Sequence, residues 1–332
     1  MHRFLRASAL LCLSLLLPIT SARAESAQGR TQYVIISFDG AHELAQWERS
    51  RALAARTGAS FTYFLSCVFL LSPETRDLYK APGKKAGRSN VGFAASKEEV
   101  SDRLMQIRLA HSEGHEIASH GCGHFDGKAW SKAEWVNEFT AFDTIFRQAY
   151  ALNGLSPEPA DWKTIADGVI GFRAPYLATG KPLYQALADK GFLYDASGVS
   201  RGPALADSAQ GPVRFSLPLI PEGPSSRRVL GMDYNLYVRH SGGFERPGEA
   251  KAFEERAYRA FTDAFESEYS GERFPLQLGF HFTLMNGGAY WRALERFLVE
   301  ACARPEVACV SYRDYLDRTA PGTQSSVVRA KG

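Results

Sequence analysis

Short apolar runs rich in β-branched and aromatic residues alternate along the chain with longer stretches whose apolar positions recur at helical spacing. The short runs predict strands at YVIISFD (33–39), SFTYFL (60–65), HEIASH (115–120), VIGFRAPY (169–176), FLYDAS (192–197), RVLGMDYN (228–235), LQLGFHF (276–282) and VACVSY (307–312). The longer stretches predict helices at EEVSDRLMQIRLAHSEG (98–114), EWVNEFTAFDTIFRQAY (134–150) and ALERFLVEACA (293–303).

This alternation predicts an α/β protein in which helices connect parallel strands. No glycine pattern typical of a dinucleotide site follows a strand, and we therefore favour a single distorted (β/α) barrel of seven or eight parallel strands over an open sheet. The polar stretches 72–90 and 200–214 are expected to be surface loops within one domain that spans residues 33–318.

The ends of the chain have a different composition. Arg3 and Arg6 precede an apolar run that ends in the small-residue site Ala22-Arg23-Ala24, and this pattern predicts a signal peptide over residues 1–24. Residues 25–32 and 319–332 are expected to be flexible. The protein is therefore expected to be exported to the periplasm or secreted, and no later run is apolar enough to predict a membrane span.

Charge narrows the range of partners. The chain has 39 basic and 36 acidic residues, and loss of the signal peptide removes three arginines, which leaves the two signs balanced. A neutral chain without a basic cluster gives no indication of nucleic acid or an anionic membrane as a partner.

Polar residues with catalytic potential fall at or near the carboxyl ends of the predicted strands. In a parallel barrel these ends share one face, where barrel enzymes have their active sites. The residues are Asp39, His120, His124, Arg173, Asp195 and His281.

Each of these residues also has an ordinary structural interpretation. Asp39 and Asp195 can each be a turn or cap residue, and Arg173 can be a surface ion-pair partner. The glycines between His120 and His124 argue against a helix, but a turn can still bring both imidazoles to one divalent ion, for which zinc is the first candidate. His281 lies within an apolar run, so it needs a buried partner and is better explained as an acid or base.

The sequence also resembles a known family, the polysaccharide deacetylases, and within it the animal-type chitin deacetylases. Five segments match the family's motifs in order, over about residues 33–316. They are ISFDGA (36–41), SHGCGH (119–124), FRAPYL (172–177), LYDAS (193–197) and LGFHF (278–282).

The resemblance implies a distorted barrel that removes N-acetyl groups from a glycan with the help of one divalent metal ion. It implies that His120 and His124 are metal ligands and that Asp39 is the general base, paired with Arg173. It further implies that His281 is the general acid and that Asp195 orients it, while the backbone N–H of Tyr176 stabilises the oxyanion.

One position departs from the family pattern. The family has two adjacent aspartates in the first motif, the second of them a metal ligand, whereas Gly40 follows Asp39 here. Asp39 itself, or His42 or Glu43 in the next loop, could then serve as the third ligand. An alternative function follows, in which the protein is a degenerate member of the family that binds glycans without hydrolysing them.

Four cysteines remain after the predicted signal peptide, an even number in a chain expected to be exported. If the second and third strands are neighbours, Cys67 and Cys122 lie side by side, and a short turn brings Cys302 close to Cys309. We therefore predict these two disulfides. The alternative is four buried free thiols that pack as small apolar groups.

Aromatic residues near the predicted strand ends could stack on the sugar rings of a substrate, although most aromatic residues in such positions belong to the core. These residues are Trp130, Trp135, Tyr176, Tyr234, Phe282 and Trp291.

Overall fold

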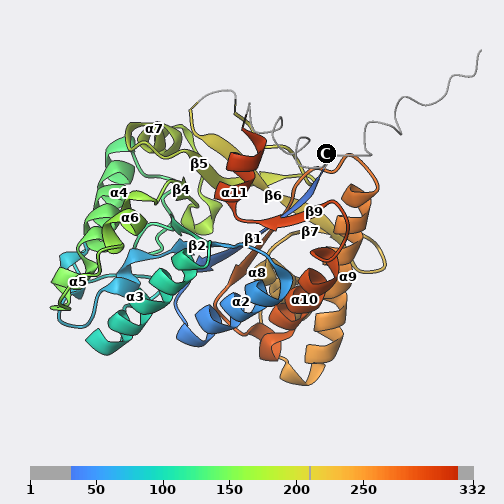
Figure 1. The fold of residues 1–332 in the computed structure, drawn as a ribbon, viewed down its shortest axis with the longest axis horizontal. Helices are drawn as coiled ribbons and strands as arrows, with labels where there is room; N and C mark the ends of the chain where they lie inside the picture. Colours follow the sequence, from blue (N-terminus) through green and yellow to red (C-terminus); the bar gives the residue numbers. More distant parts are fainter. Residues whose placement is uncertain (1–30, 209–210, 321–332) are drawn as a thin grey trace, which may run out of the picture.

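The computed structural model of the chain describes residues 31–208 and 211–320. The predicted signal peptide lies outside the described residues, as do most of the segments 25–32 and 319–332. The centre of the molecule is a strongly curled sheet with helices packed on its outer side (Figure 1).

The sheet contains nine strands in the order β7-β6-β5-β4-β3-β2-β1-β8, with β9 also paired to β1. Every pairing is parallel except that of β6 with β7. The strands are β1 (Gln32–Gly40), β2 (Thr62–Leu65), β3 (Glu116–Ser119), β4 (Gly171–Phe172), β5 (Tyr194–Ser200), β6 (Val213–Glu222), β7 (Arg227–Leu230), β8 (Leu276–His281) and β9 (Val307–Val310).

Backbone hydrogen bonds around Gly231 close the curl between β6 and β8. The Gly231 N–H donates to the carbonyl of Pro218 at 2.8 Å, and the Gly279 N–H donates to the carbonyl of Gly231 at 2.9 Å. A side chain at Gly231 would meet Leu278 at 3.0 Å, so glycine allows this close approach. The expected α/β fold, a distorted barrel, is confirmed.

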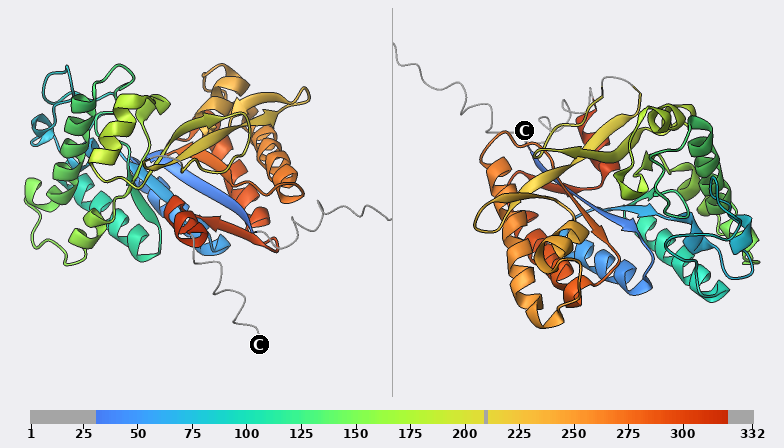
Figure 2. Two further views of the ribbon diagram at one scale, coloured as in Figure 1. Left: turned by 90° about the horizontal axis from the view of Figure 1, so that it is seen from above. Right: turned by 180° about the vertical axis from the view of Figure 1, so that it is seen from behind.

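The helices surround the barrel on its outer side, as two further views show (Figure 2). All three predicted helices are present, as α3 (Lys97–Ser112), α4 (Lys132–Arg147) and α10 (Met285–Ala301), and each ends two or three residues earlier than predicted. The helices are α2 (Leu44–Thr57), α3 (Lys97–Ser112), α4 (Lys132–Arg147), α5 (Ala149–Leu152), α6 (Trp162–Asp167), α7 (Lys181–Asp189), α8 (Asp233–Ser241), α9 (Ala250–Tyr269), α10 (Met285–Ala301) and α11 (Tyr312–Thr319), with short 3₁₀ turns η1 (Cys67–Leu70), η2 (Arg76–Leu78), η3 (Pro175–Leu177) and η4 (Pro247–Glu249). No helix in the described ranges combines the length and the apolar character required to cross a membrane.

Several predicted segments differ from the structure. The strand predicted at 169–176 is only the two-residue strand β4, and its end lies in the turn η3. The strand predicted at 228–235 ends at Leu230 as the short antiparallel strand β7, and α8 begins at Asp233. Strand β6 was not predicted, since its first residues fell within the expected loop 200–214. Its sequence contains Pro218 and Pro221, which lack the N–H that strand pairing requires. Prolines argue against a strand in a sequence-based prediction, although a strand near the edge of a sheet tolerates them.

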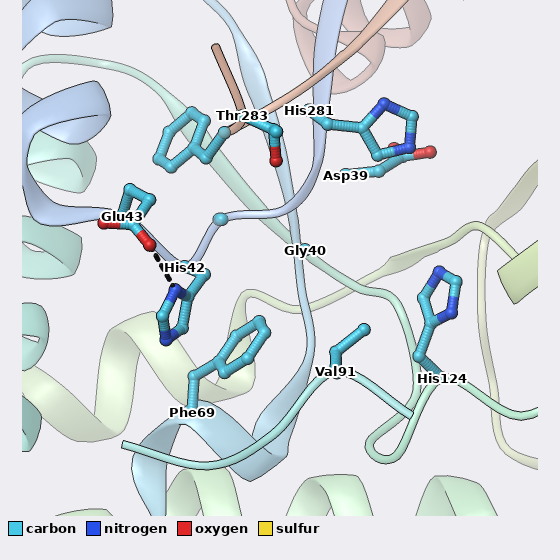
Figure 3. Close-up of a pocket in the computed structure, with 11 residues that line it drawn as sticks. Asp39, Gly40, His42, Glu43, Phe69, Val91, His124, His281 and Thr283 are labelled. Atoms are coloured by element: carbon cyan, nitrogen blue, oxygen red, sulfur yellow. Dashed lines mark hydrogen bonds and ion pairs between the residues drawn. The ribbon is translucent and has the colours of Figure 1, made fainter. Parts of the chain in front are cut away.

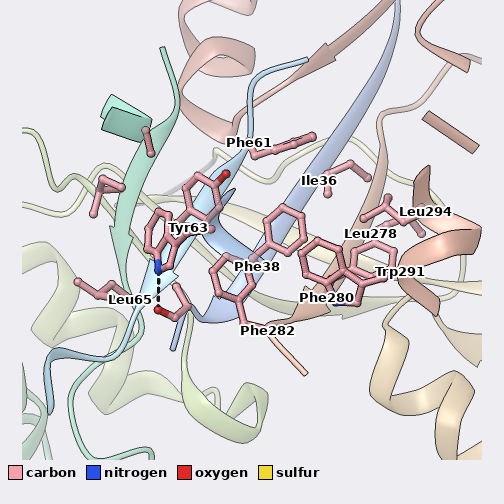
Figure 4. Close-up of a cluster of buried hydrophobic side chains, with 14 of the residues drawn as sticks. Ile36, Phe38, Phe61, Tyr63, Leu65, Leu278, Phe280, Phe282, Trp291 and Leu294 are labelled. Carbon is pink, nitrogen blue, oxygen red and sulfur yellow. Dashed lines mark hydrogen bonds between the residues drawn. The ribbon is translucent and has the colours of Figure 1, made fainter. Parts of the chain in front are cut away.

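Side-chain alternation along β1 separates the core from the site. Phe38 points outward and packs against Trp291 and Phe282, with ring centroids 5.1 and 5.4 Å apart, in an aromatic cluster between the sheet and the helices (Figure 4). Its neighbours Ser37 and Asp39 point to the opposite face, into the barrel. The rigid aromatic layer thus fixes the strand end that carries Asp39.

Candidate active site

Asp39 and Arg173 form a buried ion pair inside the barrel. Arg173 Nη1 donates to Asp39 Oδ1 at 2.8 Å, and the two side chains are 4% and 0% exposed. Burial favours the neutral carboxyl, but Arg173 foremost, together with His120 and His281, outweighs it and lowers the pKa of Asp39. Asp39 is therefore a carboxylate at neutral pH.

Arg173 reaches across the barrel and donates three further hydrogen bonds. Nη1 donates to Ser37 Oγ at 2.7 Å, Nε donates to the carbonyl of Ala196 at 2.9 Å, and Nη2 donates to the hydroxyl of Tyr312 at 2.9 Å. The guanidinium also lies over the ring of Phe64, 4.4 Å from its centroid. These contacts fix the geometry of the group that neutralises Asp39.

His281 lies directly opposite Asp39, because the parallel register of β1 and β8 pairs these two residues. Its Nδ1 is 2.7 Å from Asp233 Oδ1, and its backbone N–H donates to Asp233 Oδ2 at 2.8 Å. Burial works to lower the pKa of His281, but the charge of Asp233 and its hydrogen bond raise it to about 8. The imidazole is therefore protonated at neutral pH and can act as an acid.

The expected pairing of His281 with Asp195 is not formed. Strand β5, which carries Asp195, is separated from β8 by β4, β3, β2 and β1 in the sheet, whereas the chain leading into α8 lies beside β8. Asp195 instead accepts a hydrogen bond from Ser197 Oγ at 2.5 Å, and Ser197 Oγ accepts the N–H of Ala174 at 2.8 Å. Burial raises the pKa of Asp195 to about 6. Asp195 thus fixes the backbone next to Arg173.

Asp233 is the residue that sequence reasoning missed. It is fully buried at the first position of α8, although its segment was predicted to be a strand. An acidic residue at the start of a helical pattern was the available indication, since Leu236 and His240 follow at helical spacing.

His120 and His124 lie at the same mouth of the barrel, with ring centroids 5.1 Å apart. His120 Nδ1 is 2.7 Å from the carbonyl of Arg173, so this nitrogen carries the proton and Nε2 keeps its lone pair. Burial lowers the pKa of His120 to about 3 and also lowers the pKa of His124. Both rings are neutral, which is the form that binds metals.

The turn containing the two histidines is braced from several sides. The predicted disulfide Cys67–Cys122 is present, with Cα atoms 4.4 Å apart, and the Cys67 N–H donates to the carbonyl of Gly121 at 3.0 Å. Buried Glu138 accepts the N–H of Cys122 at 2.7 Å and the hydroxyl of Tyr79 at 2.9 Å. The second predicted disulfide, Cys302–Cys309, is also formed.

The neutral imidazoles of His120 and His124 are suitable ligands for a cation. Within the described part of the chain, the buried Nδ1 of His124 has no hydrogen-bond partner, and a metal ion or a ligand could satisfy it. Among residues 31–208 and 211–320, no group of three or more His, Cys, Asp and Glu side chains is arranged to hold a metal ion. The pair therefore fits a divalent cation as two of its ligands, and the third expected ligand has no assigned residue.

Two of the three suggested third ligands, His42 and Glu43, lie away from His124 (Figure 3). His42 Nδ1 is 2.9 Å from Glu43 Oε1, and both side chains lie at the opposite end of the pocket from His124 and His281 (Figure 3). Asp39 is held by Arg173. Gly40 has a φ of 82°, and a Cβ built there would meet only Phe69, at 3.8 Å, so the space beside it is open.

Tyr176 forms one side of the site. Its ring contacts that of His124 with centroids 4.9 Å apart, and its side chain is 60% exposed. The turn η3 holds it at a φ of 57°, a left-handed conformation unusual for tyrosine. Of the other aromatic residues expected near strand ends, Tyr234 is exposed and Trp130 is partly buried, whereas Trp135, Phe282 and Trp291 belong to the core.

No protein-family model matches the sequence, and no curated protein is similar to it in sequence. Solved structures are similar over most of the chain. A protein classed as a polysaccharide deacetylase from Mycobacterium smegmatis superimposes with a TM-score of 0.54 at 17% identity, over 87% of this chain and 90% of that one. A protein classed in the same way from Pseudomonas aeruginosa gives a TM-score of 0.52 at 16% identity, over 88% and 93%.

A third solved structure, that of Puue allantoinase, gives a TM-score of 0.51 at 16% identity, over 89% of this chain and 93% of that one. The three likenesses show a shared fold. Because proteins with different named activities share it, the function of this chain must be argued from its own side chains.

Proposed function

This chain has the polysaccharide deacetylase fold, and on that premise we propose that it hydrolyses N-acetyl groups on a glycan, chitin-like or related, and releases acetate. The observation that carries the proposal is the opposition of Asp39 and His281 on paired strands. One is held as a carboxylate and the other as an imidazolium, which are the states that a base and an acid need before turnover.

The proposed roles follow from these protonation states. Asp39 takes a proton from the water that attacks the acetyl carbonyl, and Arg173 keeps the carboxylate ionised and in place. His281 gives its proton to the departing amine, since an amine must be protonated to leave. Asp233 holds the imidazole through Nδ1, which directs the other nitrogen toward the site.

The oxyanion that forms on the acetyl group requires a donor. The backbone N–H of Tyr176 is our candidate, because the turn η3 places this residue beside His124.

His120 and His124 would hold a divalent cation, with zinc as the first candidate, because both rings are neutral and lie together. Such an ion, when bound, polarises a carbonyl and makes water more acidic. With two protein ligands, we expect it to be held more weakly than in a site with three.

The two disulfides are typical of proteins in oxidising compartments, and together with the predicted signal peptide they support export to the periplasm or secretion.

Gly40 favours a second candidate function, glycan binding without hydrolysis. It provides no side-chain oxygen where the related motif has a metal-binding aspartate. The open space beside it could instead accommodate part of a bound sugar.

The experiment is acetate release from N-acetylglucosamine oligomers by the purified protein, with metal content measured on the same sample. Asp39→Asn and His281→Ala should each lower the rate ~100-fold or more, while circular dichroism stays unchanged. The double variant His120→Ala, His124→Ala should lose about one bound divalent ion per chain.

Equal metal content in the double variant and the wild type would reject the assigned ligands. Unchanged rates in the Asp39 and His281 variants would reject the acid–base assignment. A wild type that binds the oligomers without releasing acetate would favour the binding function, and absence of both binding and hydrolysis would reject both proposals.

A further inference from the structure

Exposed apolar side chains begin beside His281 and continue along one side of α8 into the loop that follows. Tyr234 is 54% exposed, Val238 44% and Phe244 71%. Single exposed apolar residues are ordinary on protein surfaces. These three, however, form a row along α8 and the loop after it that starts beside a proposed catalytic group, and such a row needs a separate explanation. We refer to Tyr234, Val238 and Phe244 as the α8 platform.

The α8 platform is continuous with the site. The ring of Tyr234 lies 6.4 Å from that of His281, and Tyr234 directly follows Asp233, the partner of His281. Tyr234 and Val238 are four residues apart and therefore share one face of the helix. At ~1.5 Å per residue, the helix carries the platform on the order of 10 Å away from His281.

The outer end of the platform is held in place. Asn286 Oδ1 accepts the N–H of Arg246 at 2.8 Å, and the Asn286 N–H donates to Glu245 Oε1 at 3.0 Å. Asn286 Nδ2 donates to the hydroxyl of Tyr290 at 3.0 Å inside the protein. Asn286 therefore anchors the two residues that follow Phe244, so the backbone of the loop is held before a ligand arrives.

A second exposed ring lies beside His124, one of the two proposed metal ligands. Tyr176 contacts His124, whereas Tyr234 contacts His281. An exposed tyrosine therefore lies next to each of His124 and His281, which line the pocket together with Asp39. The two faces of a pyranose ring carry C–H groups that pack on aromatic rings, and the hydroxyls at the rim stay in water.

We infer that the α8 platform binds the sugar units that extend beyond the reacting unit, so that a longer sugar chain is used better than a short one. This inference rests on the proposed function. The occupant is a neutral sugar chain because the platform residues are uncharged and the charged residues beside them have partners within the protein. Asp233 pairs with His281, Arg239 donates to the carbonyl of Arg228, Glu245 accepts the N–H of Asn286, and Arg246 lies 3.6 Å from Glu249.

The test compares kcat/KM for acetate release on a disaccharide and on a hexasaccharide of N-acetylglucosamine. In the wild type we expect the longer substrate to be used about tenfold better. Phe244→Ala should remove most of that advantage, and Phe244→Trp should restore it.

Val299→Ala is the matched control. Val299 is 51% exposed on the last turns of α10, which lead into β9 at the amino end of the barrel strands. This variant should retain the full chain-length advantage. The inference is overturned if the wild type uses both substrates equally, or if Phe244→Ala and Val299→Ala behave alike.

Direct binding separates this inference from the proposed function. If no acetate is released, calorimetry with the hexasaccharide still tests the platform, and Phe244→Ala should weaken binding about tenfold. Equal hexasaccharide affinity in wild type and Phe244→Ala overturns the platform even if the protein is a deacetylase. Loss of binding to phosphatidylcholine vesicles in Phe244→Ala, with glycan binding intact, would identify a membrane-facing surface and also overturn the inference.

Discussion

At the scale of single residues, the protonation states in the site depend on which carboxylate pairs with each basic group. Asp39 meets Arg173, and His281 meets Asp233. The first contact lowers a carboxyl pKa and the second raises an imidazole pKa, so the two groups that could exchange a proton with a substrate are kept in opposite states.

The pairing of His281 with Asp233 predicts a specific pH dependence. The pKa of His281 is raised to about 8, so the acid is present below pH 8 and is lost as pH rises through that value. Acetate release should therefore decline above about pH 8. In Asp233→Asn the remaining burial favours the neutral ring, and the decline should move toward or below the ordinary imidazole value of 6.5.

Asp195→Asn is the matched control, because Asp195 hydrogen-bonds Ser197 and not the imidazole. In Asp195→Asn, the decline of acetate release should stay at about pH 8. Profiles of kcat/KM from pH 5 to 10 measure the pH of this decline. The assignment of Asp233 would be wrong if that pH shifted in Asp195→Asn and stayed unchanged in Asp233→Asn.

At the scale of elements, the strands that the sequence predicted best are buried on both faces. β1 and β8 are continuous apolar runs and were predicted nearly in full, and their ends carry Asp39 and His281. β6 and the start of α8 were missed because neither has a local sequence pattern typical of its structure. β6 contains two prolines, the start of α8 is polar, and contacts with neighbouring strands determine both. Asp233 was missed with them, since its role exists only when Gly231 joins β6 to β8.

The two disulfides join elements at very different sequence separations, 55 residues for Cys67–Cys122 and 7 for Cys302–Cys309. A crosslink restricts the unfolded chain more when it closes a longer loop. Replacing both cysteines of the first pair by serine should lower the free energy of unfolding by about 2 kcal/mol more than the same change in the second pair.

Urea unfolding of the two double variants measures this difference. The first variant should also lose metal or glycan affinity, because its disulfide borders the turn that carries His120 and His124. Equal stability losses would show that the chain-entropy account fails here, and unchanged ligand affinity would show that the other contacts suffice to hold the turn.

At the scale of the whole molecule, Arg173 connects parts of the barrel that are far apart in sequence. It contacts Ser37 and Asp39 on β1, the carbonyl of Ala196 on β5 and the hydroxyl of Tyr312 on α11. The sequence predicted that these strand ends converge, but not the distances across the barrel. Strand order and curl, which determine whether Asp195 or Asp233 reaches His281, are properties of the assembled sheet.

This central position predicts that Arg173 is required for stability as well as for activity. Arg173→Gln would leave Asp39 charged and buried without its partner, which costs about 3–5 kcal/mol of unfolding free energy. Arg49→Gln is the control, since Arg49 pairs with Glu295 and both side chains are partly exposed. Arg49→Gln should lower the free energy of unfolding by less than about 1 kcal/mol.

The effect should depend on pH with a definite sign. The pKa of Asp39 is lowered in the folded protein, so its ion pair stabilises the fold above the unfolded carboxyl pKa of about 3.9, and this contribution is lost as pH falls. The stability gap between wild type and Arg173→Gln should therefore be widest near pH 7 and should narrow below pH 4. A gap that is independent of pH would mean that Arg173 stabilises the barrel through Ser37, Ala196 and Tyr312 alone, without its charge.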